Sequence, residues 1–109
     1  MTQARKEALT DLLAKVEAGE RPRQDGTLYK LFGDNWVYCW DVMYGESLDA
    51  AKALQRAVLP RHYAQVHMWP VPEMCRVDIG GGHTGRDDEP ARAWLVAILK
   101  ALIAQEPDQ

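Results

Sequence analysis

The sequence predicts an α+β domain, a small α/β/α sandwich with a three-stranded sheet, and three observations predict it. Apolar residues recur at helical spacing near both ends of the chain. Between them, residues 63–69 and 73–79 alternate apolar and polar side chains, the pattern of half-buried strands. The length of 109 residues suits one domain, so we treat residues 1–109 as a single domain with the order α-(α)-β-α-β-β-α.

Two helices are expected at the N-terminus. The stretch from residue 3 to residue 18 places apolar residues at i, i+3, i+4 and i+7, namely Leu9, Leu12, Leu13 and Val16. Gly19 and Pro22 then end this helix, because glycine tolerates a left-handed cap and proline cannot continue the hydrogen-bond ladder. Residues 27–32 are long enough for one or two further helical turns.

Residues 35–43 are predicted to form the first strand. The segment is dominated by residue types that favour strands, Trp36, Val37, Tyr38, Cys39, Trp40 and Val42. Because these apolar residues occupy both parities, both faces of the strand are expected to be covered. Asp41 is the exception, and we expect it to be paired or to reach solvent, with a functional role as the alternative. A helix over residues 48–59 follows, with Ser47 as its N-cap.

Alternation predicts a hairpin of residues 63–69 and 73–79 and fixes its register, since directly opposed residues share a face. The apolar face pairs Val66 with Val77 and Met68 with Cys75. The other face then carries three opposed pairs, His67 with Arg76, Gln65 with Asp78, and Trp69 with Met74. Residues 70–73, which contain both prolines of this region, form the loop because proline lacks the donor that a ladder needs.

The glycine-rich segment Gly80 to Glu89 is expected to be a flexible polar loop before a last helix over residues 90–105. Its position after a strand and before a helix is that of a phosphate-binding loop, but its spacing is neither that of a Walker A loop nor Gly-x-Gly-x-x-Gly. The helix start also carries three carboxylates, Asp87, Asp88 and Glu89, which repel an anion. We therefore expect a connecting loop rather than a phosphate site.

The residue patterns assign no catalytic residue, no metal ligand and no cofactor. Cysteines 39 and 75 and histidines 62, 67 and 83 lack zinc-site spacing, so the thiols are expected to be free, small core residues. Ser47 is the only serine and no nucleophile elbow surrounds it. One alternative remains open, a ligand-binding protein or small enzyme that uses a cleft between the Gly80–Glu89 loop and Asp41 or His83.

Charge and hydropathy argue against nucleic acid and membrane as partners. The formal net charge is -3, from 16 acidic and 13 basic residues, and no basic stripe interleaved with aromatic residues is visible, so nucleic acid is not expected. The longest apolar stretch, residues 93–99, is far short of a membrane span, and residues 1–7 lack the apolar run of a secretion signal. We therefore expect a cytoplasmic protein with no membrane partner.

Five residues are candidates for binding a partner. His67, Trp69 and Arg76 share one face of the predicted hairpin, and tryptophan and arginine are enriched at interface hot spots. His83 and Arg86 lie in the predicted loop that follows. A structural interpretation competes with this hypothesis, in which the first helix covers the hairpin face.

Three stretches resemble the phage ABA sandwich domain, a family of small phage and prophage proteins of unknown function. They are Leu9-Thr-Asp-Leu-Leu-Ala-Lys-Val-Glu-Ala-Gly, Tyr44-Gly-Glu-Ser-Leu-Asp-Ala-Ala-Lys-Ala-Leu, and the alanine- and leucine-rich end that starts at Pro90. The strong apolar run at residues 36–43 and the glycines at 80–82 depart from that family's pattern. The resemblance implies an α/β/α sandwich of viral or prophage origin and supplies no catalytic residues.

Together these inferences predict a non-enzymatic phage or prophage accessory protein in the cytoplasm of a host cell. It would act by binding a host or phage protein, for example a host defence complex such as CRISPR or restriction, or a regulatory complex. Two alternatives to this function remain open. The first is the ligand-binding protein or small enzyme described above, and the second is a virion structural component. The sequence leaves open whether the chain forms a homodimer.

Overall fold

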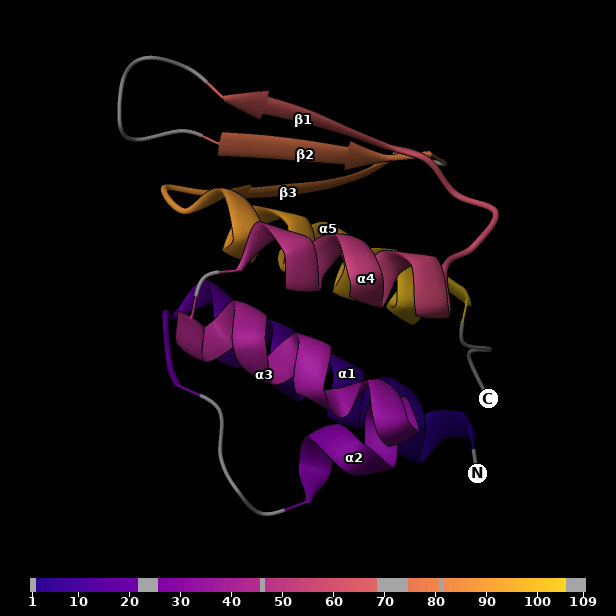
Figure 1. Ribbon diagram of the computed structural model, residues 1–109. Helices are drawn as coiled ribbons and strands as arrows, with labels where there is room; N and C mark the ends of the chain where they lie inside the picture. Colours follow the sequence, from indigo (N-terminus) through magenta and orange to yellow (C-terminus); the bar gives the residue numbers. More distant parts are fainter. Residues whose placement is uncertain (1, 22–25, 46, 69–74, 81, 106–109) are drawn as a thin grey trace.

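The computed structural model describes residues 2–21, 26–45, 47–68, 75–80 and 82–105. It contains helices and strands in the order α1 (Thr2–Glu17), α2 (Thr27–Phe32), the 3-10 turn η1 (Gly33–Asn35), α3 (Trp36–Gly45), α4 (Leu48–Val58), β1 (Ala64–Met68), β2 (Cys75–Ile79), β3 (His83–Asp87) and α5 (Pro90–Gln105). The strands form one antiparallel sheet in the order β1-β2-β3 (Figure 1). The predicted α+β class is confirmed. The sheet has three strands and includes the predicted hairpin, but its third strand is residues 83–87 rather than residues 35–43.

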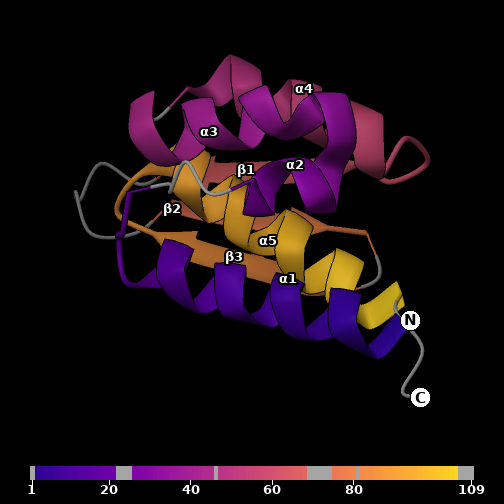
Figure 2. The same ribbon diagram turned by 90° about the horizontal axis from the view of Figure 1, so that it is seen from below.

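The sheet forms an outer layer, and the helices lie on one side of it (Figures 1 and 2). Helix α5 packs on β3 and β2, with α1 and α4 on its two flanks, and α3 packs against α4. The buried face of β2 presents Cys75, Val77 and Ile79 to this layer. Helix α5 is consequently the centre of the core, and Leu95, Ile98 and Leu99 are fully buried in it.

The hairpin register follows from the alternation, as predicted. Ladder pairs join Val66 to Val77, Met68 to Cys75, His67 to Arg76 and Gln65 to Asp78. The expected Trp69–Met74 pair and the loop over residues 70–73 lie outside the described residues. Every polar residue of β2 therefore points away from α5, so the sheet has one apolar and one polar face.

The prediction of a strand over residues 35–43 is wrong, because residues 36–45 form helix α3. The buried residues Cys39, Val42 and Met43 recur at helical spacing and face the core. A second stripe of the same helix carries Trp36, Trp40 and Tyr44, and Trp36 and Trp40 make an edge-to-face contact on it. These residue types do favour strands, but the segment forms a helix because only a helix brings its apolar residues together on one buried stripe.

The prediction of a flexible loop over residues 80–89 is also wrong, because residues 83–87 form the third strand. β3 pairs antiparallel with β2 over five residues, from Cys75–Asp87 to Ile79–His83. At its centre, Gly85 lies against the backbone of α5, where an added Cβ would sit 2.6 Å from the Ala97 nitrogen and closer still to the Ala93 oxygen. The glycine that weakens a strand in isolation is what lets this strand contact the helix.

The predicted N-cap of the helix after residue 47 is confirmed. The Ser47 hydroxyl accepts a hydrogen bond from the Ala50 amide at 3.1 Å, which makes it the N-cap of α4. Helices α4 and α5 are joined by Gln55, the one buried polar side chain among the described residues. Its side-chain oxygen accepts a hydrogen bond from the Trp94 indole N–H, and its side-chain nitrogen donates one to the His62 carbonyl. No helix of the described segments has the length and apolarity needed to cross a bilayer.

Candidate functional site

The side of the sheet opposite α5 carries a set of polar side chains that we call the polar sheet face. It consists of alternate residues on all three strands, Gln65, His67, Arg76, Asp78, Thr84 and Arg86. Helix α1 packs against α5 and α2, not across this face. The competing expectation that the first helix covers it is therefore wrong, and His67, Arg76 and Arg86 are open to solvent to different degrees.

Asp78 is the centre of the polar sheet face. Its Oδ1 accepts a hydrogen bond from Arg76 Nε at 3.1 Å and its Oδ2 accepts one from a terminal nitrogen of Arg76 at 2.8 Å, so the pair is bidentate. It also accepts a hydrogen bond from the Thr84 hydroxyl at 2.8 Å, and His67 Nε2 lies 3.4 Å away. The hydrogen bonds from Arg76 and Thr84 hold the pKa of Asp78 below its usual value. The ionised Asp78 carboxylate thus contacts side chains from all three strands.

Arg76 and Arg86 face each other directly across β2 and β3. The Gly80 amide donates a hydrogen bond to the Tyr63 carbonyl at 3.0 Å, which makes Tyr63–Gly80 a hydrogen-bonded pair. In an antiparallel ladder every second pair is of this kind, so His67–Arg76 is also a hydrogen-bonded pair between β1 and β2. The backbone groups of Arg76 therefore point to β1, and Arg76–Arg86 is a non-hydrogen-bonded pair, in which side chains lie closest. Arg76 is neutralised by Asp78, whereas Arg86 is exposed and has no charged partner among the described residues.

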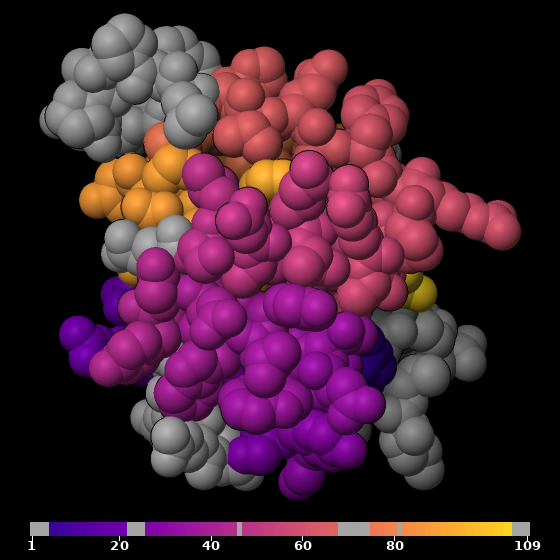
Figure 3. All heavy atoms as spheres, in the orientation of Figure 1, coloured from indigo at the N-terminus to yellow at the C-terminus, as the bar shows by residue number. Residues whose placement is uncertain are grey.

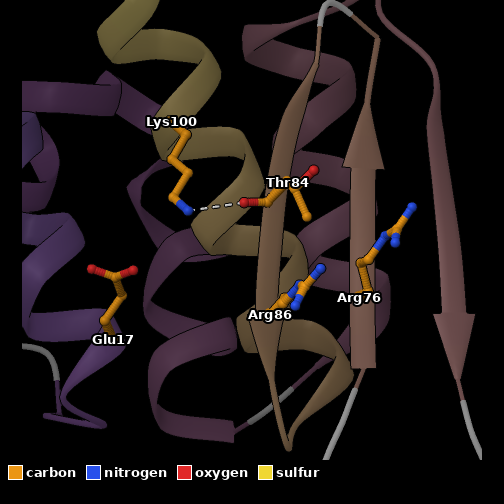
Figure 4. A pocket seen from close by; sticks show the side chains of 5 residues that line it. All are labelled: Glu17, Arg76, Thr84, Arg86 and Lys100. Atoms are coloured by element: carbon orange, nitrogen blue, oxygen red, sulfur yellow. Dashed lines mark hydrogen bonds between the residues drawn. The ribbon is translucent and has the colours of Figure 1, made fainter.

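A shallow hollow continues the polar sheet face over the free edge of β3. It has a volume of about 390 Å³ and is lined by Glu17, Arg76, Thr84, Arg86 and Lys100 (Figure 4). Lys100 Nζ donates a hydrogen bond to the Thr84 carbonyl at 3.0 Å, which ties α5 to the edge of the strand. Three cations and one carboxylate line the hollow, so its chemistry suits a carboxylate or another small anion.

The other candidate residues from the sequence are not on this face. His83 begins β3 opposite Ile79, so its side chain belongs to the helix-facing side of the sheet. Trp69 lies outside the described residues. Asp41 is exposed on α3, which packs mainly on α4, and residues 83–87 form a strand rather than a loop. The structure thus unites His67, Arg76 and Arg86 and separates them from Asp41 and His83.

The start of α5 is occupied by its own carboxylates, as the sequence predicts. Asp87 accepts a hydrogen bond from the Glu89 amide at 3.0 Å, and Glu89 accepts one from the Ala91 amide at 3.1 Å. Arg92 bonds the same Asp87 carboxylate at 3.3 Å. Some of the free backbone N–H groups at the helix start, which could otherwise hold a phosphate, are therefore already bonded to these carboxylates.

The thiols lie in the core. Cys39 and Cys75 are both free and buried, and burial raises the pKa of Cys39 to about 12. A thiol with so high a pKa stays protonated at neutral pH, which makes it a poor nucleophile. Within the described part of the chain, no three His, Cys, Asp or Glu side chains are grouped so that they could hold a metal ion.

Helix α3 presents an aromatic stripe that the strand prediction concealed. Trp36, Trp40 and Tyr44 follow one another at intervals of four, and the Trp40 and Tyr44 rings stack with centroids 6.0 Å apart. The Arg21 guanidinium lies 5.1 Å from the Tyr44 ring centre. Figure 3 views the molecule from the side of α3 and α4. The Tyr44 side chain is 59% exposed. The interval of four residues is the signal in the sequence that points to a helix with this stripe.

Comparisons of the chain with known protein families, with curated proteins and with solved structures found no match.

Proposed function

We propose that this chain is a non-enzymatic binding protein whose polar sheet face contacts an acidic surface of a partner protein. The observation that supports this is the direct opposition of Arg76 and Arg86 on a sheet face that no described helix covers. Like charges opposed in the close pairs of a sheet cost stability. Asp78 already offsets the charge of Arg76, and a bound anion beside Arg86 would offset the second charge of the pair.

The charge balance of the face explains why an acidic partner is expected. Asp78 compensates only one positive charge, and that is Arg76. Arg86 and Lys100 also line the hollow, and Glu17 supplies the one carboxylate among its described lining residues. A partner carboxylate entering here meets a planar guanidinium able to bind it through two parallel hydrogen bonds. The whole chain has a formal net charge of -3, so the positive charge around the hollow is a local excess.

We further propose the biological setting that the sequence resemblance implies. The stretches at residues 9–19, 44–54 and 90–102 resemble phage ABA sandwich proteins, which favours a phage or prophage accessory protein. Its partner would then be a host or phage protein in the host cytoplasm, such as a defence or regulatory complex. Identification of the neighbouring genes tests this setting, because tail genes would instead favour a virion component.

The binding proposal is tested by charge reversal. The probe is a poly-glutamate peptide, titrated at low and at physiological salt into the wild-type chain, into Arg86→Glu and into Lys52→Glu. Lys52 is exposed on α4, away from the sheet, so its variant makes the same change in net charge. Thermal unfolding of each variant verifies that the fold is retained.

We expect Arg86→Glu to weaken binding of the peptide at least about tenfold, since loss of an interface arginine costs on the order of 2 kcal/mol. Lys52→Glu should bind like the wild type apart from a small change that salt removes. Equal weakening by both substitutions would mean that only net charge matters. That result, or no binding of the peptide to the wild type, would refute the proposal.

A further inference from the structure

We infer that the free edge of β1 is a self-association surface, on which a second copy of this chain adds its own β1 in antiparallel orientation. The inference concerns the edge of the sheet, so it stands independently of the partner proposed for the polar sheet face. It rests on the hydrogen-bonding register, on a difference between the two edges, and on the symmetry of residues 64–68.

The register shows which backbone groups of β1 are available. Because Tyr63–Gly80 is a hydrogen-bonded pair, Gln65–Asp78 and His67–Arg76 are hydrogen-bonded pairs as well. The intervening residues Ala64, Val66 and Met68 therefore direct their amides and carbonyls away from β2. No described residue makes a backbone hydrogen bond to these groups.

The opposite edge of the sheet is protected, whereas none of the described side chains bonds to the outer edge of β1. On β3 the outward Thr84 carbonyl is occupied by the Lys100 ammonium group, a charged side chain of the kind that blocks further strand addition. Residues 64–68 contain no formally charged side chain, apart from protonation of His67, and no proline. Edge strands of folded proteins normally carry such a block, so its absence on β1 indicates an edge that is used.

The sequence of β1 complements itself about Val66. An antiparallel partner related by a twofold axis at Val66 sets Val66 opposite its equivalent and Ala64 opposite Met68 of the second copy, all on the apolar side. On the polar side, Gln65 lies opposite His67 of the second copy. Because Ala64 and Val66 are only partly buried in the single chain, pairing covers apolar surface that is now exposed.

The pairing forms a six-stranded sheet from two copies. Since the twofold axis stands perpendicular to the sheet, the polar sheet faces of both copies lie on the same side of the six-stranded sheet. The dimer therefore presents two Arg76–Arg86 pairs, one from each copy, on one surface. A ladder of five residues buries less than the area of a stable standard interface. We therefore expect a dimer that dissociates on dilution.

The test measures mass against concentration by sedimentation equilibrium, from low micromolar to millimolar chain. The wild type should rise from the monomer mass of 12.3 kDa toward twice that value. Two double variants on the solvent side of β1 form a matched pair. Gln65→Lys with His67→Lys sets lysine against lysine across the interface, whereas Gln65→Lys with His67→Glu sets lysine against glutamate.

We expect the Lys/Lys variant to remain monomeric and the Lys/Glu variant to dimerise at least as well as the wild type. Neither change touches the apolar side, and circular dichroism verifies the fold of each variant. A wild type that stays at the monomer mass at every concentration overturns the inference. Equal dimerisation of all three chains also overturns it, because the interface would then lie elsewhere. Neither result depends on whether poly-glutamate binds.

Discussion

Replacement of Gly85 by alanine tests how the sheet is attached to the helices. The structure allows no room for a methyl group, because a Cβ at residue 85 would lie 2.6 Å from the Ala97 nitrogen and closer still to the Ala93 oxygen. Both atoms belong to the backbone of α5, which cannot rotate away as a side chain could. Either β3 or α5 must therefore move.

The magnitude follows from the packing. Overpacking of a well-filled core costs about 1–3 kcal/mol, and reduced flexibility of the unfolded chain returns only about 0.4–1 kcal/mol. We expect a net loss near the upper part of that range, since α5 is the centre of the core. For a domain of this size each kcal/mol lowers the midpoint of thermal unfolding by about 4–8 °C.

The assay is denaturant unfolding of Gly85→Ala beside Gly45→Ala, followed by circular dichroism. A Cβ at Gly45, the last residue of α3, meets nothing within 4 Å, so this control should leave stability unchanged or raise it by up to about 1 kcal/mol. If Gly85→Ala unfolds at the same denaturant concentration as the wild type, the close approach of β3 and α5 is refuted.

Two further predictions concern the helical layer. Ser47→Ala removes the acceptor for the Ala50 amide and should lower the free energy of unfolding by about 1 kcal/mol, measured by urea denaturation; an unchanged midpoint would mean that the cap is not formed in solution. Cys39 keeps its proton to a pKa of about 12 when folded, against 9.0 for the free thiol, so the unfolded chain ionises first and stability falls as the pH rises above 9. Cys39→Ala should remove that part of the pH dependence, and an identical slope in the variant would contradict the burial of the thiol.

The hairpin was predictable because one physical constraint decides it. Alternation sorts Ala64, Val66 and Met68 from Gln65 and His67, and a slip of one residue would expose the entire apolar set. The same constraint predicted the opposed pairs on the polar side. What the alternation cannot reveal is which layer covers each face, so the openness of the polar sheet face came only from the structure.

The two errors have a common physical origin in tertiary contacts. Residues 36–43 carry strand-favouring side chains, yet Cys39, Val42 and Met43 reach the core together only on a helix. Residues 83–87 include a glycine and charged side chains that disfavour strands, yet they pair with β2 and pack against α5. In both segments the partner element, distant in the chain, outweighed local propensity.

The candidate site was predictable in part for the same reason. His67 and Arg76 were placed together by the hairpin register. Arg86 was named as a candidate in a presumed loop, and only the third strand sets it opposite Arg76. The contributions of Thr84 and Lys100 depend on contacts between β3 and its neighbours, for which the local sequence carries no signal.

The outward sheet positions have one consequence for how this protein can change. Core packing depends on the residues of β2 that face α5, and the intervening residues point to the other side of the sheet. Substitutions at the outward positions can therefore alter recognition while leaving most of the folding free energy untouched. A small scaffold with this separation can acquire new specificities, in nature or in a selection library, without first losing its fold.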